Sequence, residues 1–258
     1  MIPRFFVEPW QIAGESVQIS GEELVHLARV LRLTPGSTVT ICDGTGQEYR
    51  TVLKEILPEM AVAQIVQRMP STVEPRVKIT LVQGIPKADK MDFIIQKGTE
   101  LGISEFLPVF TERTIVQLSG AKALRRAERW QRIAKEAAKQ SQRAIIPKVH
   151  SAITWQECLT RYREKTRGRL GLFPWEKLAG EESTGSGLRS VWADTLKQSD
   201  VRDIWVFIGP EGGWSEREAE EAAAMGIAAL SLGSRILRTE TAGIVAAALI
   251  LYEAGDLG

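Results

Sequence analysis

The first seventy residues combine one helical pattern with short runs of alternating apolar and polar positions. Leucine recurs at helical spacing within 24–31, which predicts an amphipathic helix. Ser20 followed by Glu23 predicts a capping box at the start of this helix, and Pro35-Gly36 predicts its end.

Strand patterns follow the helix at 38–42, 48–56 and 60–66. A turn at Asp43-Gly44 joins the first two, and the segment 70–75 has the composition of a linker. Short strands joined by tight turns are typical of a small β-barrel, which we expect for the N-terminal part of the chain.

From residue 76 onwards, strand and helix patterns alternate. Strands are predicted at 78–83, 106–109, 170–173, 204–208 and 227–232. Helices are predicted from Asp89 to Gly102, over 121–143, from a Ser215–Glu218 capping box to about residue 225, and over 241–252, and a Gly/Ser-rich loop is predicted at 181–187. This alternation predicts an α/β fold in which helices cover a parallel sheet.

Composition narrows the class of protein more than it narrows the function. The 258 residues suffice for one large domain or two modest ones, and 44% hydrophobic with 25% charged residues is ordinary for a soluble protein. A net charge of +1 indicates no partner. The N-terminus lacks the apolar core of a signal peptide, and the most apolar stretch, 242–251, is too short to span a bilayer. We therefore expect a cytoplasmic protein.

Cysteine and histidine are too sparse for a zinc site or a disulfide framework. The chain has two cysteines, Cys42 and Cys158, and two histidines, His26 and His150. We interpret both cysteines as packing residues and assign no function to His150. A reducing compartment fits this composition.

A glycine-rich segment directly follows the strand predicted at 204–208. It comprises Gly209, Pro210, Glu211, Gly212 and Gly213. Glycines at the carboxyl end of a strand let a ligand approach the backbone, and open α/β sheets bind ligands at this edge. An ordinary strand-to-helix turn is the alternative, but a turn does not require this many special residues.

A second segment, 232–242, follows the next strand and opens the last helix. Leu232, Ile236 and Leu237 are suited to the apolar walls of an adenine pocket, and Gly233 leaves room for backbone contact. Thr239 and Thr241 are candidate helix N-caps. Arg238 and Glu240 have either a functional role or the structural role of an ion pair that holds the loop. The structural role is plausible for Glu240 and less plausible for both residues together.

Several other nucleotide sites are disfavoured by the sequence. There is no G-x-G-x-x-G at an N-terminal βα turn, no P-loop lysine motif and no cluster of metal-ligating residues. The two segments therefore predict a ligand site of a different kind.

The helix predicted at 121–143 carries an excess of positive charge. Nine basic residues stand against two acidic ones between Lys122 and Lys148, and Trp130, Ala134 and Ala137 lie on the opposite, packing face. A solvated helix face is the usual explanation for such a run, but this imbalance favours contact with phosphates. Two further basic patches point the same way: His26, Arg29 and Arg32, and then Lys87 and Lys90.

Taken together, these segments resemble the ribosomal RNA small-subunit methyltransferase E family, in the SPOUT class of knotted methyltransferases. The motifs that carry the resemblance are Arg4-Phe5-Phe6, 26–32, 87–92, 97–102, Glu112-Arg113, 140–143 with Pro147, 209–213 and 235–242. The last two are the most specific.

The resemblance implies a PUA-like β-barrel at residues 1–72, which would bind RNA, and a trefoil-knotted α/β methyltransferase domain with a parallel sheet at residues 73–258. A knot is rare and does not follow from composition or spacing. The resemblance also implies a homodimer, S-adenosyl-L-methionine as cofactor, and a ribosomal RNA or small ribosomal subunit partner. The implied reaction is methylation of N3 of a uridine in 16S ribosomal RNA.

The resemblance assigns residues to the cofactor and to RNA. The expected cofactor-binding residues are Ile208, Gly209, Pro210, Glu211, Gly212, Gly213, Leu232, Gly233, Ile236, Leu237, Arg238, Thr239, Thr241 and Ala242. The expected RNA-binding residues are Arg4, His26, Arg29, Arg32, Lys87, Lys90, Arg113 and Arg143. For His26, a surface or capping role is an equal alternative.

Two residues are expected to act in catalysis. A neutral uridine N3 holds its proton and is a poor nucleophile, so the developing anion needs stabilisation. Arg238 is expected to stabilise negative charge on a uracil oxygen, and Glu240 is expected to orient Arg238. No covalent nucleophile is required, because the methyl group is already activated in the cofactor.

Two rival functions stay open at this point. One keeps the fold and the chemistry but changes the substrate to another RNA. The other is a non-catalytic RNA-binding ribosome-assembly factor, which predicts degraded pocket residues. The segments 209–213 and 238–241 are intact.

Overall fold

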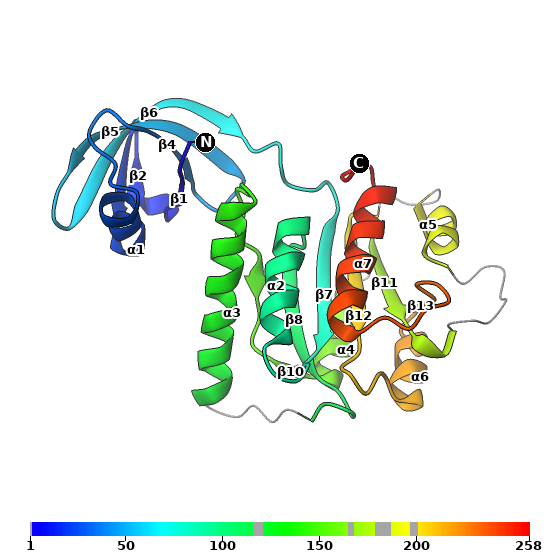
Figure 1. The fold of residues 1–258 in the computed structure, drawn as a ribbon. Helices are drawn as coiled ribbons and strands as arrows, with labels where there is room; N and C mark the ends of the chain where they lie inside the picture. Colours follow the sequence, from blue (N-terminus) through cyan, green and yellow to red (C-terminus); the bar gives the residue numbers. More distant parts are fainter. Residues whose placement is uncertain (1, 116–120, 165–167, 179–186, 197–200) are drawn as a thin grey trace. The chain divides into compact units, whose positions relative to one another are not determined.

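The computed structural model describes residues 2–115, 121–164, 168–178, 187–196 and 201–258, which form two compact units (Figure 1). The first unit contains residues 1–74 and 138–146, and the second contains 75–137 and 147–258. Most of the loop predicted at 181–187 lies outside the described residues. In the part of the chain that is described, no helix is long and apolar enough to cross a membrane.

The N-terminal unit is built on one six-stranded sheet. Its strands, in spatial order, are β1 (Arg4–Phe6), β4 (Thr38–Cys42), β5 (Gln47–Ile56), β6 (Met60–Pro70), β3 (Ser16–Ser20) and β2 (Ile12–Ala13). Strands β1 and β4 pair in parallel and the other neighbours are antiparallel. Alternate positions such as Val39 and Ile41 are fully buried, which explains why a period of two located β4. The predicted strands are confirmed, and β6 extends four residues further than expected.

The helical segment of this unit differs from the prediction at both ends. Helix α1 (Gly21–Val25) begins where expected, but the Ser20 side chain makes no capping hydrogen bond. The carboxylate of Glu23 is instead buried and lies 2.8 Å from the Lys139 ammonium group. The chain then forms a π-helical turn (His26–Val30), which ends five residues before Pro35. The predicted capping box is therefore wrong, because a partner distant in sequence binds its acidic member.

The segment 138–146 belongs to the N-terminal unit although it follows the first half of the second unit in sequence. Ala138 and Ala144 pack in a small apolar cluster with Phe6 and Cys42. The carboxylate of Glu74 then fixes the segment, because it accepts hydrogen bonds from the backbone N–H of Ala144 (2.9 Å) and of the next residue (3.0 Å). This unit is therefore discontinuous in sequence.

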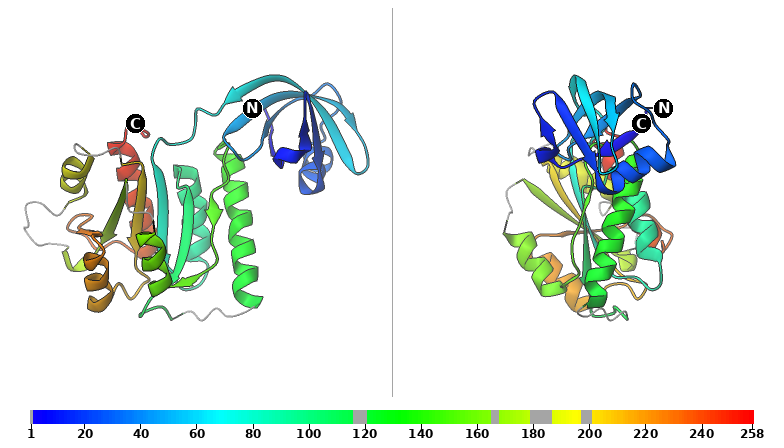
Figure 2. Two further views of the ribbon diagram at one scale, coloured as in Figure 1. Left: turned by 180° about the vertical axis from the view of Figure 1, so that it is seen from behind. Right: turned by 90° about the vertical axis from the view of Figure 1, so that its left-hand side faces the viewer.

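The second unit contains a seven-stranded sheet whose pairings are all parallel (Figure 2). The spatial order is β10 (Ile153–Thr154), β8 (Glu105–Phe110), β7 (Lys78–Gly84), β12 (Asp203–Ile208), β11 (Arg169–Pro174) and β13 (Ala228–Leu230), with β9 (Lys148–Val149) paired to β8. Because parallel strands are covered on both faces, the central strands are almost entirely buried.

Six α-helices accompany this sheet within the described residues. They are α2 (Lys90–Leu101), α3 (Ala121–Gln140), α4 (Trp155–Arg163), α5 (Leu188–Leu196), α6 (Glu216–Ala224) and α7 (Thr239–Glu253). The Ser215–Glu218 capping box is confirmed, and Gly102 ends α2 in the left-handed conformation as predicted (φ +118°). Helix α7 begins at Thr239, two residues earlier than expected, and its N-cap is Arg238, so neither Thr239 nor Thr241 is the N-cap that the sequence predicted.

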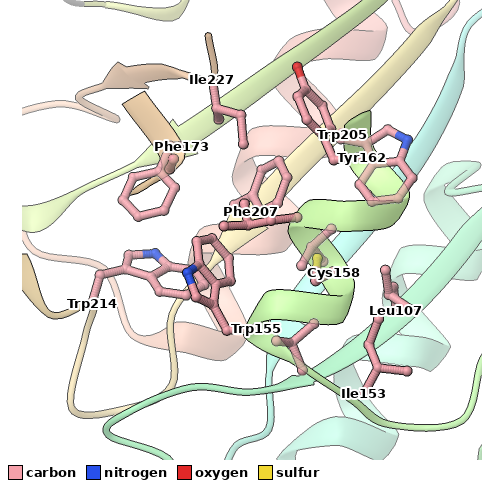
Figure 3. Close-up of a cluster of buried hydrophobic side chains, with 14 residues drawn as sticks. Leu107, Ile153, Trp155, Cys158, Tyr162, Phe173, Trp205, Phe207, Trp214 and Ile227 are labelled. Carbon is pink, nitrogen blue, oxygen red and sulfur yellow. The ribbon is translucent and has the colours of Figure 1, made fainter. Parts of the chain in front are cut away.

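An aromatic cluster forms the core on the face of the sheet that α4 covers (Figure 3). Trp155 packs against Phe207 and against Trp214, with ring centroids 6.0 and 5.1 Å apart. Phe173 lies 4.8 Å from Trp214. Because Trp214 directly follows the segment 209–213 and is 1% exposed, this cluster anchors the end of that loop.

Candidate functional site

A cleft of about 420 Å³ opens at the carboxyl ends of β11, β12 and β13. The lining residues are Lys90, Pro174, Trp175, Glu176, Ile208, Gly209, Pro210, Glu211, Gly212, Gly213, Ser231, Leu232, Gly233, Arg235, Ile236, Leu237, Arg238, Thr239 and Ala242. Its position matches the edge at which open α/β sheets bind ligands, and its volume suits a small organic molecule.

The loop after β12 approaches the neighbouring strand β7 very closely. A Cβ atom placed on Gly84 would lie 2.6 Å from the ring of Pro210, so only glycine allows this contact. Gly213 adopts a positive φ of +68°, which also favours glycine. The glycines of this segment therefore serve the shape of the cleft wall.

The first turn of α7 forms the opposite wall of the cleft. The Thr239 hydroxyl donates a hydrogen bond to the Gly209 carbonyl (2.6 Å), and it accepts one from the Gln83 amide (2.9 Å). Thr239 is 6% exposed and Gln83 is fully buried. The two predicted cofactor segments are thus joined directly, through a polar contact that the sequence did not reveal.

Lys90 connects the two segments a second time, at the more exposed side. Its ammonium group lies 2.9 Å from the Glu211 carboxylate and 3.3 Å from that of Glu240. The hydrogen bond to Glu211 raises the pKa of Lys90 despite partial burial. Burial opposes ionisation of Glu211, but the hydrogen bonds from Lys90 and from the Lys87 backbone outweigh it and lower the pKa of that carboxyl. Lys90 and Glu211 are therefore both charged at neutral pH.

Arg238 is the N-cap residue of α7, and its side chain lines the cleft in an exposed position. Among the described residues, its guanidinium group has no hydrogen-bonding or ion-pair partner. A guanidinium group held at a helix N-terminus adds its charge to the partial positive charge of the helix end. This end of the cleft is suited to an anion or to an oxygen that gains negative charge.

The predicted cofactor residues come together in this cleft, with one exception. All of them line it apart from Thr241, an exposed residue in the first turn of α7. Glu240 does not line the cleft and reaches it through Lys90. The expected pairing of Glu240 with Arg238 is not observed, because the Glu240 carboxylate faces the Lys90 ammonium group.

Sequence reasoning missed one wall of the cleft. Pro174 ends β11, Trp175 and Glu176 follow it, and Ser231 and Arg235 follow β13. The signal was present, since the strand predicted at 170–173 ends at the same edge of the sheet as the glycine-rich loop. Lys90 was assigned to RNA but is engaged with two carboxylates.

The predicted RNA-binding residues are not equivalent in the structure. Arg29, Arg32, Lys87 and Arg113 are exposed, and Arg113 Nη1 also donates a hydrogen bond to the Gly212 carbonyl (2.8 Å). His26 is half-buried, with its ring edge-on to Phe5.

Two of these residues have structural partners inside the N-terminal unit. Arg143 is 4% exposed and lies 2.7 Å from the Glu74 carboxylate. Arg4 lies 3.0 Å from the carboxylate of Glu48. Each charge is already paired, with Arg143 buried and Arg4 half-buried, and these contacts indicate a structural role for both residues.

Both cysteines are buried, as expected of packing residues. Burial raises the pKa of each thiol, Cys42 and Cys158, to about 12. Both thiols are therefore protonated and neither is a nucleophile. Among the described residues, no group of three or more His, Cys, Asp or Glu side chains could hold a metal ion.

Comparison with known proteins places both units in described families. The family described as "RNA methyltransferase domain" matches residues 73–251, and the family described as "RNA methyltransferase PUA domain" matches residues 19–63. Ribosomal RNA small subunit methyltransferase E of Bacillus subtilis is 33% identical over 254 residues, covering 97% of this chain and 96% of its own length. The protein of the same name from Synechocystis is 36% identical over 256 residues, covering 97% and 77%.

Solved structures agree with these relatives. The ribosomal RNA small subunit methyltransferase E of Neisseria gonorrhoeae, bound to S-adenosyl methionine, is 31% identical with a TM-score of 0.81, and the match covers 98% of each chain. A structure from Legionella pneumophila, in complex with the bound cofactor SAM, is 26% identical with a TM-score of 0.80 and the same coverage.

Proposed function

The chain belongs to the ribosomal RNA small subunit methyltransferase E family, and on this premise we propose that it transfers a methyl group from S-adenosyl-L-methionine to N3 of a uridine in 16S ribosomal RNA. Membership of the family confirms the resemblance drawn from the sequence. The predicted fold class is confirmed as well, with a PUA-like N-terminal domain and a parallel-sheet α/β methyltransferase domain.

The cleft carries the proposal, because its residues fit an adenosine that bears a charged tail. Ile208, Leu232 and Leu237 supply apolar surface for a purine ring. A Cβ placed on Gly233 would meet no atom within 4 Å, and this open backbone (φ +112°) leaves peptide groups accessible for hydrogen bonds. We propose that this cleft holds the cofactor.

When bound, S-adenosyl-L-methionine supplies a methyl group that is already activated by the sulfonium charge. The protein then has to hold the uracil N3 in line with that methyl group and to stabilise the charge left when N3 loses its proton. We assign this electrostatic role to Arg238, whose guanidinium lines the cleft and has no partner among the described side chains. Glu240 acts on the site through Lys90, at a distance of 3.3 Å.

The exposed basic residues are proposed to bind the phosphates of the substrate RNA. On the methyltransferase domain these are Lys87 and Arg113, next to the glycine-rich loop, together with Arg125 and Arg132 of α3. On the PUA-like domain they are Arg29 and Arg32. We propose that residues 1–72 form the RNA-binding domain and residues 73–258 the methyltransferase domain, of which the segment 138–146 packs with the N-terminal unit.

Three further properties belong to the same proposal. We propose a trefoil knot in the C-terminal domain, a homodimer, and action in the cytoplasm, where ribosomal subunits are assembled. Apolar side chains left exposed around α7 and the cleft support the homodimer, since Ile236 is 76% and Tyr252 is 59% exposed.

Transfer of a labelled methyl group to small ribosomal subunits that lack their own modification tests the proposal. Nucleoside analysis of the product RNA is expected to give a labelled 3-methyluridine. Cofactor binding without transfer to this substrate, but with transfer to another RNA, would show that the substrate is that other RNA. Failure to bind the cofactor would refute the methyltransferase function and favour a non-catalytic RNA-binding protein.

A further inference from the structure

We propose that Gln83 is a positioning residue for the cofactor, which acts through Thr239 and Gly209 to hold the two cofactor-binding segments together. The inference rests on the proposed function of the cleft. Gln83 does not line the cleft, so its effect on the cofactor is indirect.

The three residues form one directional chain of hydrogen bonds. Gln83 Nε2 donates to Thr239 Oγ1 at 2.9 Å, and Thr239 Oγ1 donates to the carbonyl oxygen of Gly209 at 2.6 Å. Gln83 Nε2 also donates to the carbonyl of Gly84 at 2.9 Å, which fixes the orientation of the amide. A hydroxyl that accepts one hydrogen bond and donates the next strengthens both, especially away from water.

This chain links three segments that are far apart in sequence. Gln83 lies at the end of the central strand β7, Gly209 opens the loop after β12, and Thr239 is the first residue of α7. Gln83 is fully buried and Thr239 is 6% exposed, so little water competes for these bonds. The first bond therefore fixes the start of α7 to the central strand, and the second fixes the loop after β12 to the start of α7.

Satisfaction of buried polar groups does not by itself require this arrangement. A methionine at position 83 would fill a similar volume without any polar atom, and the Gln83 carbonyl oxygen has no hydrogen-bond partner among the described residues. A buried amide with one unsatisfied atom costs stability. We infer that its benefit lies in the geometry that it imposes on the cleft.

The hydrogen bond between Thr239 and Gly209 also determines which backbone groups of the loop remain to bind a ligand. The Gly209 carbonyl is engaged with Thr239, and Pro210 has no N–H to donate. The peptide between them therefore acts as a fixed wall, and hydrogen bonds to the cofactor have to come from the residues on either side.

Two pairs of variants of the full-length protein test the inference. Thr239→Val removes the hydroxyl at nearly constant volume, whereas Thr239→Ser keeps it. Gln83→Met removes the amide, and Thr80→Val, at a buried threonine on the same strand, controls for a change of core polarity. S-adenosyl-L-methionine binding is measured by calorimetry, and backbone hydrogen exchange is measured for the segments 209–213 and 239–243.

Thr239→Val and Gln83→Met are expected to weaken cofactor binding by about 10- to 100-fold and to speed exchange in both segments. Thr239→Ser, which keeps the hydroxyl, is expected to lose much less affinity than Thr239→Val, and Thr80→Val is expected to bind like the wild type. The combined Gln83→Met and Thr239→Val variant should lose little more affinity than either single variant, because both break the same chain.

Two results would overturn the inference. One is unchanged affinity in Thr239→Val and Gln83→Met, even if the melting temperature falls, since that pattern belongs to a purely structural role. The other is unchanged exchange in the two segments. A wild-type protein that fails to bind the cofactor would instead refute the proposed function, and hydrogen exchange alone would then decide whether the contact holds the segments together.

Discussion

Basic side chains have opposite surroundings at two places in the molecule, one in each unit. In the N-terminal unit, Lys139 and Arg143 are buried against Glu23 and Glu74, with distances of 2.8 and 2.7 Å. At the cleft, Arg235 and Arg238 are exposed and have no carboxylate partner among the described residues. A run of positive charge in a sequence therefore predicts contact with nucleic acid only once the acidic partners of those basic residues within the fold are known.

The largest expected effect comes from breaking a buried pair. Glu74→Ala leaves the guanidinium of Arg143 buried without its counter-charge, and it removes the acceptor for two backbone N–H groups. We expect a loss of about 3–5 kcal/mol in the free energy of unfolding of the N-terminal unit, measured by urea denaturation and hydrogen exchange. The matched control is Glu15→Ala, in an exposed pair with Arg68, which should cost no more than about 1 kcal/mol. Equal losses would show that burial does not distinguish the two pairs.

Removal of the exposed Arg238 side chain at the cleft is expected to lower kcat much more than it lowers the melting temperature. Arg238→Ala should lower kcat by about 100- to 1000-fold, because it removes stabilisation of the developing uracil anion. The melting temperature should stay close to that of the wild type, since this side chain is exposed. Arg189→Ala, at an exposed arginine that pairs with Glu253 outside the cleft, serves as control. A kcat for Arg238→Ala close to the wild-type value would remove this residue from catalysis.

Helix α3 allows the comparison to be repeated on a single element. Arg125 and Arg132 are exposed, whereas Arg129 Nε donates a hydrogen bond to the Asp92 carboxylate at 3.0 Å. RNA binding is measured across a range of salt concentrations. Alanine at position 125 or 132 should lower the slope of the logarithm of the RNA-binding constant against log salt by about 1. Alanine at position 129 should change it less. The same change at all three positions would mean that internal pairing does not decide which arginines contact phosphate.

The smallest expected effect concerns a carboxylate at the opposite edge of the sheet. Glu105 accepts a hydrogen bond from His150 (2.8 Å) and pairs with Lys78, and these partners lower the pKa of its carboxyl from 4.5 to about 2. The ionised Glu105 carboxylate therefore contributes fully to the stability of the fold above pH 4.5. This contribution is lost as the pH falls from 4.5 towards 2. Glu105→Gln should flatten the dependence of the melting temperature on pH in that window. An unchanged pH profile would show that other carboxyls control acid unfolding.

The sequence predicted the elements whose signals are local. The strand Asp203–Ile208 is an uninterrupted apolar run, and the Ser215–Glu218 box caps the helix that follows, as expected. The short strands Ile12–Ala13 and Lys148–Val149 were missed, because two residues carry no detectable period. The Ser20–Glu23 box had the same sequence signature as the correct one, but Glu23 is bound by a lysine more than a hundred positions away.

The candidate site likewise contains residues that local sequence signals predicted and residues that they did not. The two segments 209–213 and 232–242 were found because glycine after a strand marks the binding edge of a parallel sheet. Trp175 was not found, since nothing in its local sequence separates a cleft residue from a core aromatic. Gln83 was not predicted for a different reason: its role depends on hydrogen bonds that run from Gln83 to Thr239 and from Thr239 to Gly209, and only the fold brings these residues within reach.

The placement of 138–146 in the N-terminal unit has a consequence for synthesis on the ribosome. The first 74 residues emerge well before their last piece, and at about 5–20 residues per second the barrel waits several seconds for it. During that interval Glu23 and Glu74 lack Lys139 and Arg143, and Phe6 and Cys42 lack their apolar cover. The nascent barrel is therefore an incomplete folding unit, and its completion is timed by translation of the first half of the methyltransferase domain.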